Sequence, residues 1–209
     1  MSGRVLLLHG IGRRPGSMGK MERAVAEAGF ETRNLSYPSR IAPIEALAEI
    51  ALERAAGFLP AAGEPLHFVG HSMGGLVARA MIRAAPSLTP GRVVTLGSPH
   101  RGSEIADLLW RTWPYRRWFG PAGAQLTTQN PWHPEHVTYE LGAIAGDRTF
   151  DPLCWWLIPG PNDGKVAVAR AGISGMADFV TLHAGHTFMP RNRAAIEQTI
   201  HFLRHGRFK

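Results

Sequence analysis

Short apolar runs alternate with longer amphipathic stretches along most of the chain. The apolar runs predict strands at Arg4–Leu8, Glu31–Leu35, Leu66–Val69, Gly91–Leu96, Leu141–Ala145 and Asp178–Leu182. The amphipathic stretches predict helices at Ser17–Ala28, Pro43–Leu59, Met73–Ala85 and Arg191–Leu203. Strands that alternate with helices in this way form right-handed βαβ units. The pattern therefore predicts an α/β protein with a mainly parallel sheet and helices on both faces.

One segment, at about 103–138, departs from this rhythm. It has no strand pattern, and it is rich in aromatic residues: Trp110, Trp113, Tyr115, Trp118, Phe119 and Trp132. Residues 104–113 predict a helix with Ile105, Leu108, Leu109 and Trp113 on one side. That apolar stripe either packs on the core or forms the inner face of a cap that binds an acyl chain. Because no linker interrupts the chain, we expect one domain over 1–209 with a cap-like insertion at about 103–138.

Length and cysteine usage narrow the class of protein. A chain of 209 residues is long enough to bury one sizeable core. The apolar run before His9 is too short for a signal peptide, and no run approaches the roughly 20 residues of a membrane helix. The single cysteine, Cys154, cannot form an internal disulfide. We therefore expect a cytoplasmic protein.

The net charge of +7 favours anionic partners or simply a basic surface. The positive charges are scattered, and the sequence has neither zinc-finger spacing nor an RNA-binding aromatic signature. We therefore expect no nucleic-acid partner. Arg111, Arg116 and Arg117 lie beside Trp and Tyr residues, a combination that suits a transient contact with an anionic lipid surface.

The first predicted strand runs into a glycine-rich loop, "HGIGRRPGSMGKM". A phosphate-binding P-loop would need a glycine at Arg14 and a hydroxyl residue at Met21, and both are missing. A dinucleotide-binding loop would need its third glycine one residue before Gly16, and an acid at the end of the second strand. We therefore expect no nucleotide cofactor.

The stretch "LHFVGHSMGGLVARA" places G-x-S-x-G between a predicted strand and a predicted helix. In this context the central serine, Ser72, sits on a sharp turn that pushes its Oγ clear of the sheet. Gly70 and Gly74 allow the strand and the helix to approach without a Cβ clash. The helix N-terminus directs free N–H groups toward a developing oxyanion. The motif thus predicts a nucleophilic serine.

Together, "GHSMGG", the early "HG" and "VVTLGSPHRGS" resemble the α/β-hydrolase lipases and esterases, especially small bacterial triacylglycerol lipases. The resemblance implies a compact α/β-hydrolase fold that lacks the first two strands of the full fold. It also implies the chain order serine, acid, histidine. No redox cofactor is implied, and we find no ligand set for the structural calcium of some related lipases.

Two histidines follow the last predicted strand, in "FVTLHAGHTFMP". His183 directly continues the apolar run, whereas His186 lies in a loop free to reach Ser72 and also matches the resemblance. We therefore expect His186 to be the base. His183–His186 and His133–His136 also have H-x-x-H spacing, but neither pair has a third ligand, so we expect no metal.

The acid that orients the base has three candidates. Asp147 directly follows a predicted strand, Asp151 lies four residues later, and Asp163 lies in "PNDGKVAV". The last stretch resembles the acid-bearing loop of the lipases, and an Asn-Asp-Gly turn can present a carboxylate by tight local geometry. We favour Asp163 and keep Asp147 as the main alternative.

The oxyanion hole needs two backbone N–H groups. One should come from Met73, the residue after the nucleophile. The resemblance implies that Ile11, the residue after His-Gly, supplies the other. For the substrate pocket we expect His9, Arg13, Leu108, Leu109 and Trp113.

These features predict a serine hydrolase that cleaves carboxylic esters through Ser72, His186, Asp163 and an acyl-enzyme intermediate. The expected substrate is a small-molecule ester or a lipid. Two alternatives stay open: an acyltransferase or thioesterase with the same triad, and a non-catalytic lipid-binding member of the fold.

Overall fold

The computed structural model describes residues 3–129, 136–149 and 152–209. It contains one six-stranded sheet with the strand order β2-β1-β3-β4-β5-β6, in which every neighbouring pair is parallel. The strands are β1 (Arg4–Leu8), β2 (Glu31–Leu35), β3 (Pro65–His71), β4 (Thr89–Leu96), β5 (Leu141–Gly146) and β6 (Asp178–Leu182). The predicted parallel sheet is confirmed, and the described sheet contains no antiparallel strand.

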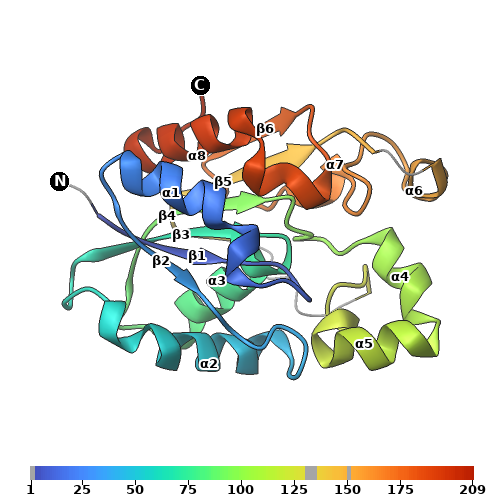
Figure 1. The fold of residues 1–209 in the computed structure, drawn as a ribbon, viewed down its shortest axis with the longest axis horizontal. Coiled ribbons are helices and arrows are strands. Elements are labelled where there is room, and N and C mark those ends of the chain that lie inside the picture. Colours follow the sequence, from blue (N-terminus) through green and yellow to red (C-terminus); the bar gives the residue numbers. More distant parts are fainter. Residues whose placement is uncertain (1–2, 130–135, 150–151) are drawn as a thin grey trace.

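Helices cover both faces of the sheet (Figure 1). They are α1 (Gly19–Glu27), α2 (Ile44–Ala55), α3 (Met73–Ala84), α4 (Glu104–Trp110), α5 (Trp113–Ala124), α6 (Pro152–Leu157), α7 (Val168–Ala171) and α8 (Arg193–His205). Three short 3₁₀ helices are η1 (Pro15–Ser17), η2 (Ala56–Phe58) and η3 (His186–Arg191). In Figure 1, α1 and α8 lie on one face of the sheet, and α2 and α3 lie on the other.

The central strands β1, β3, β4 and β5 are largely buried on both sides because helices cover both faces of the sheet. The edge strands β2 and β6 keep polar and partly exposed residues. In β1, Leu6 and Leu8 belong to the core shared with α2 and α3, whereas Val5 and Leu7 belong to the core shared with α1 and α8. This alternation follows from the two-residue period of a strand.

Three predicted helices differ from the observed ones at their ends. The first is divided, because Pro15 begins η1 and α1 starts only at Gly19. The second ends in η2, and the last begins later, at Arg193. There the Asn192 side chain accepts the Ala195 N–H at 3.1 Å and caps the helix.

The segment between β4 and β5 forms α4 and α5, which lie side by side beyond one end of the sheet (Figure 1). The helix predicted over 104–113 is shorter and ends at Trp110, and Pro114 lies in the first turn of α5. Trp132 and His133 lie outside the described residues. Whether this segment acts as a cap stays a prediction. Within the described ranges, no helix has both the length and the apolar character needed to cross a membrane.

Candidate active site

Ser72 lies on the turn between β3 and α3. Its φ of 55° makes it the only non-glycine residue with a positive φ among those described. The Ser72 N–H donates to the Leu96 carbonyl at 2.8 Å, which ties the strained turn to β4. A backbone conformation this costly persists only where the surroundings hold it, and such strain is concentrated at functional sites.

Two glycines make this turn sterically feasible. A Cβ on Gly70 would lie 2.5 Å from the Gly75 Cα, and a Cβ on Gly74 would lie 2.2 Å from the Leu8 carbonyl oxygen. Both contacts are with backbone atoms, which cannot rotate away. The G-x-S-x-G spacing is therefore required for β3, α3 and β1 to pack this closely.

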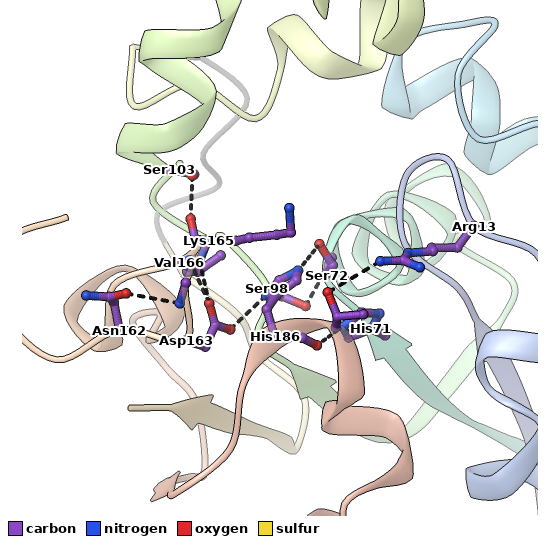
Figure 2. Close-up of polar contacts among 12 residues, drawn as sticks. Arg13, His71, Ser72, Ser98, Ser103, Asn162, Asp163, Lys165, Val166 and His186 are labelled. Carbon is purple, nitrogen blue, oxygen red and sulfur yellow. Dashed lines mark hydrogen bonds and ion pairs between the residues drawn. The ribbon is translucent and has the colours of Figure 1, made fainter. Parts of the chain in front are cut away.

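Ser72, His186 and Asp163 form a continuous chain of hydrogen bonds, although more than a hundred residues separate the first two in sequence (Figure 2). The His186 Nε2 lies 3.0 Å from the Ser72 Oγ, and its Nδ1 lies 2.7 Å from the Asp163 Oδ2. The side chains of His186 and Asp163 are only 6% and 1% exposed. With Nδ1–H donating to the carboxylate, Nε2 is left as the acceptor for the serine hydroxyl.

The loop that carries Asp163 holds the carboxylate in one orientation. Its Oδ1 accepts the N–H groups of Lys165 at 2.9 Å and Val166 at 2.8 Å, which leaves Oδ2 directed at His186. The Asp163 carbonyl also accepts the His186 N–H at 2.9 Å, so the two loops are joined through backbone as well. Such turns of an Asx side chain onto its own backbone are what the Asn-Asp-Gly sequence favours.

His183 and Asp147, the competing candidates for the base and the acid, form a pair with each other and not with Ser72. The His183 Nδ1 lies 3.0 Å from the Asp147 Oδ1, with 72% and 37% of their side chains exposed. The described residues record no hydrogen bond between either of them and Ser72. Asp151 lies outside the described residues.

The loop after β1 lies against the turn that carries Ser72. A Cβ on Gly10 would lie 3.1 Å from the Ser72 Cβ, so the loop passes close to the serine because it begins with glycine. The Arg13 N–H donates to the Gly10 carbonyl at 3.1 Å, and Gly12 has a φ of 66°, which closes a tight turn around Ile11. The backbone N–H groups of Ile11 and Met73 donate to no other residue in the described part of the chain.

Two contacts at the site involve side chains to which the sequence analysis gave no role. The Ser98 hydroxyl donates to the Ser72 carbonyl at 2.7 Å, and the His71 Nε2–H donates to the His186 carbonyl at 3.0 Å (Figure 2). Burial lowers the pKa of His71 well below the ordinary histidine value, and the neighbouring His186 lowers it further. The neutral His71 ring therefore helps position the loop of His186. His71 lies in the stretch "GHSMGG" and Ser98 in "VVTLGSPHRGS", so the motifs that carry the resemblance could have indicated both residues.

A cavity of about 360 Å³ opens beside Ser72. Its apolar wall is formed mainly by the segment between β4 and β5, through Ile105, Ala106, Leu109, Tyr115, Phe119 and Leu126. Burial raises the pKa of Tyr115 to about 12, so this phenol stays uncharged at neutral pH. A pocket of this size and character suits an apolar small molecule.

The cavity contains two of the five residues expected for the substrate pocket, Arg13 and Leu109. Leu108 and Trp113 are exposed and do not line the cavity. Trp113 begins α5 and does not continue the predicted stripe, because α4 ends at Trp110. His9 is buried, stacks on Tyr37 with ring centroids 4.4 Å apart, and lines a different cavity. Within the ranges that the structure describes, no three His, Cys, Asp or Glu side chains are grouped to hold a metal ion.

Comparison with known proteins points to one superfamily. A family model described as "PGAP1-like alpha/beta domain" matches residues 62–109. A triacylglycerol lipase of Pseudarthrobacter phenanthrenivorans is 48% identical over 44 residues, which are 21% of this chain and 14% of that protein. The lysosomal thioesterase PPT2 of Mus musculus is 28% identical over 143 residues, covering 56% of this chain and 47% of that protein. The chain thus spans less than half the length of these two relatives.

Solved structures match nearly the whole chain. The mature form of the lipase BlEst2 of Bacillus licheniformis aligns with a TM-score of 0.71 at 19% identity, covering 96% of this chain and 91% of that one. The type II thioesterase BorB from the borrelidin biosynthetic cluster aligns with a TM-score of 0.65 at 17% identity, covering 98% and 92%. At this identity the likeness concerns the fold, which is that of the α/β hydrolases.

Proposed function

This chain is a member of the α/β-hydrolase superfamily, and we propose that it is a serine hydrolase that cleaves carboxylic esters through Ser72, His186 and Asp163. The observation that carries the proposal is the buried, continuous chain of hydrogen bonds from the Asp163 carboxylate through His186 to the Ser72 hydroxyl. A serine becomes a nucleophile when an oriented base can take its proton, and this arrangement meets that requirement.

The proposed reaction begins when the Ser72 Oγ attacks the ester carbonyl carbon. His186 Nε2 accepts the hydroxyl proton, and the Asp163 carboxylate stabilises the resulting imidazolium through Nδ1–H. The carbonyl π electrons move to oxygen, and the unpaired N–H groups of Ile11 and Met73 are suitably placed in the sequence to stabilise that oxyanion. Fixed backbone donors of this kind typically contribute about 3–4 kcal/mol each to lowering the barrier.

The tetrahedral intermediate then collapses to an acyl-enzyme. The bond between the carbonyl carbon and the leaving oxygen breaks, and His186 returns its proton to that oxygen. Water attacks the acyl-enzyme with His186 again as base, which releases the carboxylic acid and regenerates the Ser72 hydroxyl. The Ser98 hydroxyl, bonded to the Ser72 carbonyl, keeps the nucleophile in its strained conformation through both steps.

An apolar acyl group is the best fit to the cavity beside Ser72. The wall from α4 and α5 supplies apolar surface, and the same two helices leave Leu108, Trp113 and Trp118 exposed to solvent. Exposed aromatic residues beside the arginines of α5 suit binding at a lipid interface. We therefore propose lipid-like esters as the preferred substrates, with the segment between β4 and β5 acting as a cap over the acyl group.

A thioester is the second candidate substrate class. The alignment with the lysosomal thioesterase covers 56% of this chain, whereas the alignments with the triacylglycerol lipases cover 21%. The two-step mechanism is the same for both classes, since only the leaving atom differs.

A fluorophosphonate probe tests the proposal directly. We expect the folded protein to be labelled covalently and Ser72→Ala to remain unlabelled, while His183→Ala, which changes a histidine outside the site, is labelled like the wild type. A panel of p-nitrophenyl esters and matched thioesters from two-carbon to long acyl groups then measures the substrate class. Equal labelling of wild type and Ser72→Ala would overturn the serine-hydrolase proposal and favour a non-catalytic lipid-binding protein.

A further inference from the structure

A second cavity, of about 710 Å³, lies on the other side of the loop after β1. It shares Gly12, Arg13 and Trp118 with the cavity beside Ser72, so the two spaces adjoin at the tip of that loop. Its own wall comes from the loops after β1 and β2 and from Arg54 of α2, and it includes the buried residues His9 and Tyr37. The Tyr37 hydroxyl donates to the His9 carbonyl, which fixes the two loops to each other.

Four arginines line this second cavity: Arg13, Arg14, Arg40 and Arg54. No acidic residue lines it, and none of the four forms an ion pair with any residue in the described ranges. Arginines elsewhere in the molecule do form ion pairs, such as Arg170 with Glu104 at 2.8 Å. Four like charges around one hollow repel each other, and an anion in the hollow relieves that repulsion.

Three of the four arginines, Arg13, Arg40 and Arg54, make contacts that leave their charge uncompensated. The Arg54 guanidinium donates to the Ser36 carbonyl at 2.7 Å, and the Arg40 guanidinium lies 4.5 Å from the centre of the Trp118 ring. Arg13 donates to the Thr187 hydroxyl at 3.4 Å, beside His186 (Figure 2). Arg13 thus extends from the arginine-lined cavity to the loop that carries His186.

We propose that this arginine-lined cavity binds a phosphate group carried on the leaving-group side of the substrate, an inference that rests on the proposed hydrolase function. The apolar cavity would then hold the acyl group, and the scissile carbonyl would lie between the two at Ser72. Guanidinium groups form paired hydrogen bonds with phosphate oxygens, and these are stronger than bonds between neutral groups.

The phosphate itself does not react. The Ser72 Oγ forms a bond to the carbonyl carbon, the bond from that carbon to the leaving oxygen or sulfur breaks, and His186 protonates the leaving atom. The released alcohol or thiol keeps its phosphate intact. Two small-molecule sources share this chemistry: an acyl ester of glycerol 3-phosphate, and an acyl thioester of coenzyme A.

A binding measurement tests the cavity without requiring turnover. Coenzyme A and sn-glycerol 3-phosphate are titrated by calorimetry into Ser72→Ala protein at fixed ionic strength. The same background carrying Arg14→Gln and Arg54→Gln removes two of the four charges, and Arg83→Gln is the matched control, because Arg83 is exposed on α3 and lines neither cavity. We expect at least one ligand to bind about tenfold more weakly to the double arginine variant than to the control.

Two pairs of matched substrates then separate the two sources. Acyl coenzyme A is compared with the same acyl group on N-acetylcysteamine, and 1-acylglycerol 3-phosphate with 1-acylglycerol. We expect the ratio of kcat/KM within one pair to fall by about tenfold in Arg14→Gln/Arg54→Gln relative to Arg83→Gln. The pair that responds identifies the leaving group.

The two proposals fail in different ways. Equal affinities for both ligands and equal substrate ratios in the double variant and the control would overturn the phosphate site, even in an active enzyme. Absence of fluorophosphonate labelling would overturn the hydrolase proposal, whereas the calorimetric loss in the arginine variant would still support an anion site in this cavity.

Discussion

Replacing Asp163 by asparagine changes one atom group in the proposed active site and leaves its packing intact. In the wild type, the Asp163 Oδ1 accepts the N–H groups of Lys165 and Val166 at 2.9 and 2.8 Å, and the asparagine carbonyl oxygen can accept the same two groups. The amide NH₂ then faces the His186 Nδ1, where the carboxylate Oδ2 lies at 2.7 Å in the wild type. Because an NH₂ group donates, Nδ1 must become the acceptor, and the ring proton moves to Nε2.

This tautomer change removes the base. With its proton on Nε2, His186 can no longer accept the proton of the Ser72 hydroxyl, which lies 3.0 Å away. The same inversion in a serine triad lowers kcat by about 10⁴-fold, equivalent to about 5.4 kcal/mol of activation free energy. We expect a loss of this size in Asp163→Asn, with KM for a p-nitrophenyl ester changed little because the substrate cavity does not include Asp163.

The matched control is Asp147→Asn, which changes the competing carboxylate in the exposed pair with His183. Steady-state hydrolysis of a p-nitrophenyl ester gives kcat and KM for both variants, and thermal melting followed by circular dichroism establishes that both are folded. We expect Asp147→Asn to retain wild-type kcat. Retained activity in Asp163→Asn together with a large loss in Asp147→Asn would contradict the assignment of the acid.

Two further predictions concern stability. Gly74→Ala forces its Cβ and the Leu8 carbonyl apart by about 0.8 Å, so we expect it to cost about 1–3 kcal/mol or more in urea unfolding. Gly16→Ala, with nothing within 4 Å, should cost little, and equal costs would contradict the steric explanation. Because burial lowers the pKa of His71, the unfolded chain binds more protons below about pH 6.5 than the folded chain does. The free energy of unfolding should therefore fall, through this residue, as the pH is lowered from about 7.5 to about 5.5. His71→Gln should remove that part of the fall, whereas His183→Gln, at an exposed site, should not.

The centre of the sheet was predictable from local sequence because β1, β3, β4 and β5 contain runs of residues that are buried on both faces. All six predicted strands exist, and the disagreements are confined to their ends and to the helix ends. Those ends depend on capping contacts, such as the Asn192 side chain on the Ala195 N–H, that periodicity does not contain. The stripe predicted over 104–113 was the largest departure, since α4 ends at Trp110 and Trp113 begins a second helix, where its side chain is exposed.

A site residue was predictable where its neighbours in the sequence also determine its local backbone conformation. The turn at Ser72 is a local feature, because glycines two residues on either side provide the space for it. The choice between two histidines and three aspartates was not local. Asp147 and His183 follow neighbouring strands just as a catalytic pair would, and the structure pairs them at the surface.

The sequence by itself determined the alternation of strands and helices, the strained serine turn and the Asx turn at Asp163, because each depends on residues within a few positions of one another. Only the tertiary structure decided which carboxylate meets His186, which side chains line the cavity beside Ser72, and that four arginines from two loops and helix α2 line one hollow. These outcomes depend on how loops after different strands meet at one edge of a parallel sheet, and that meeting is decided by contacts between residues far apart in the chain.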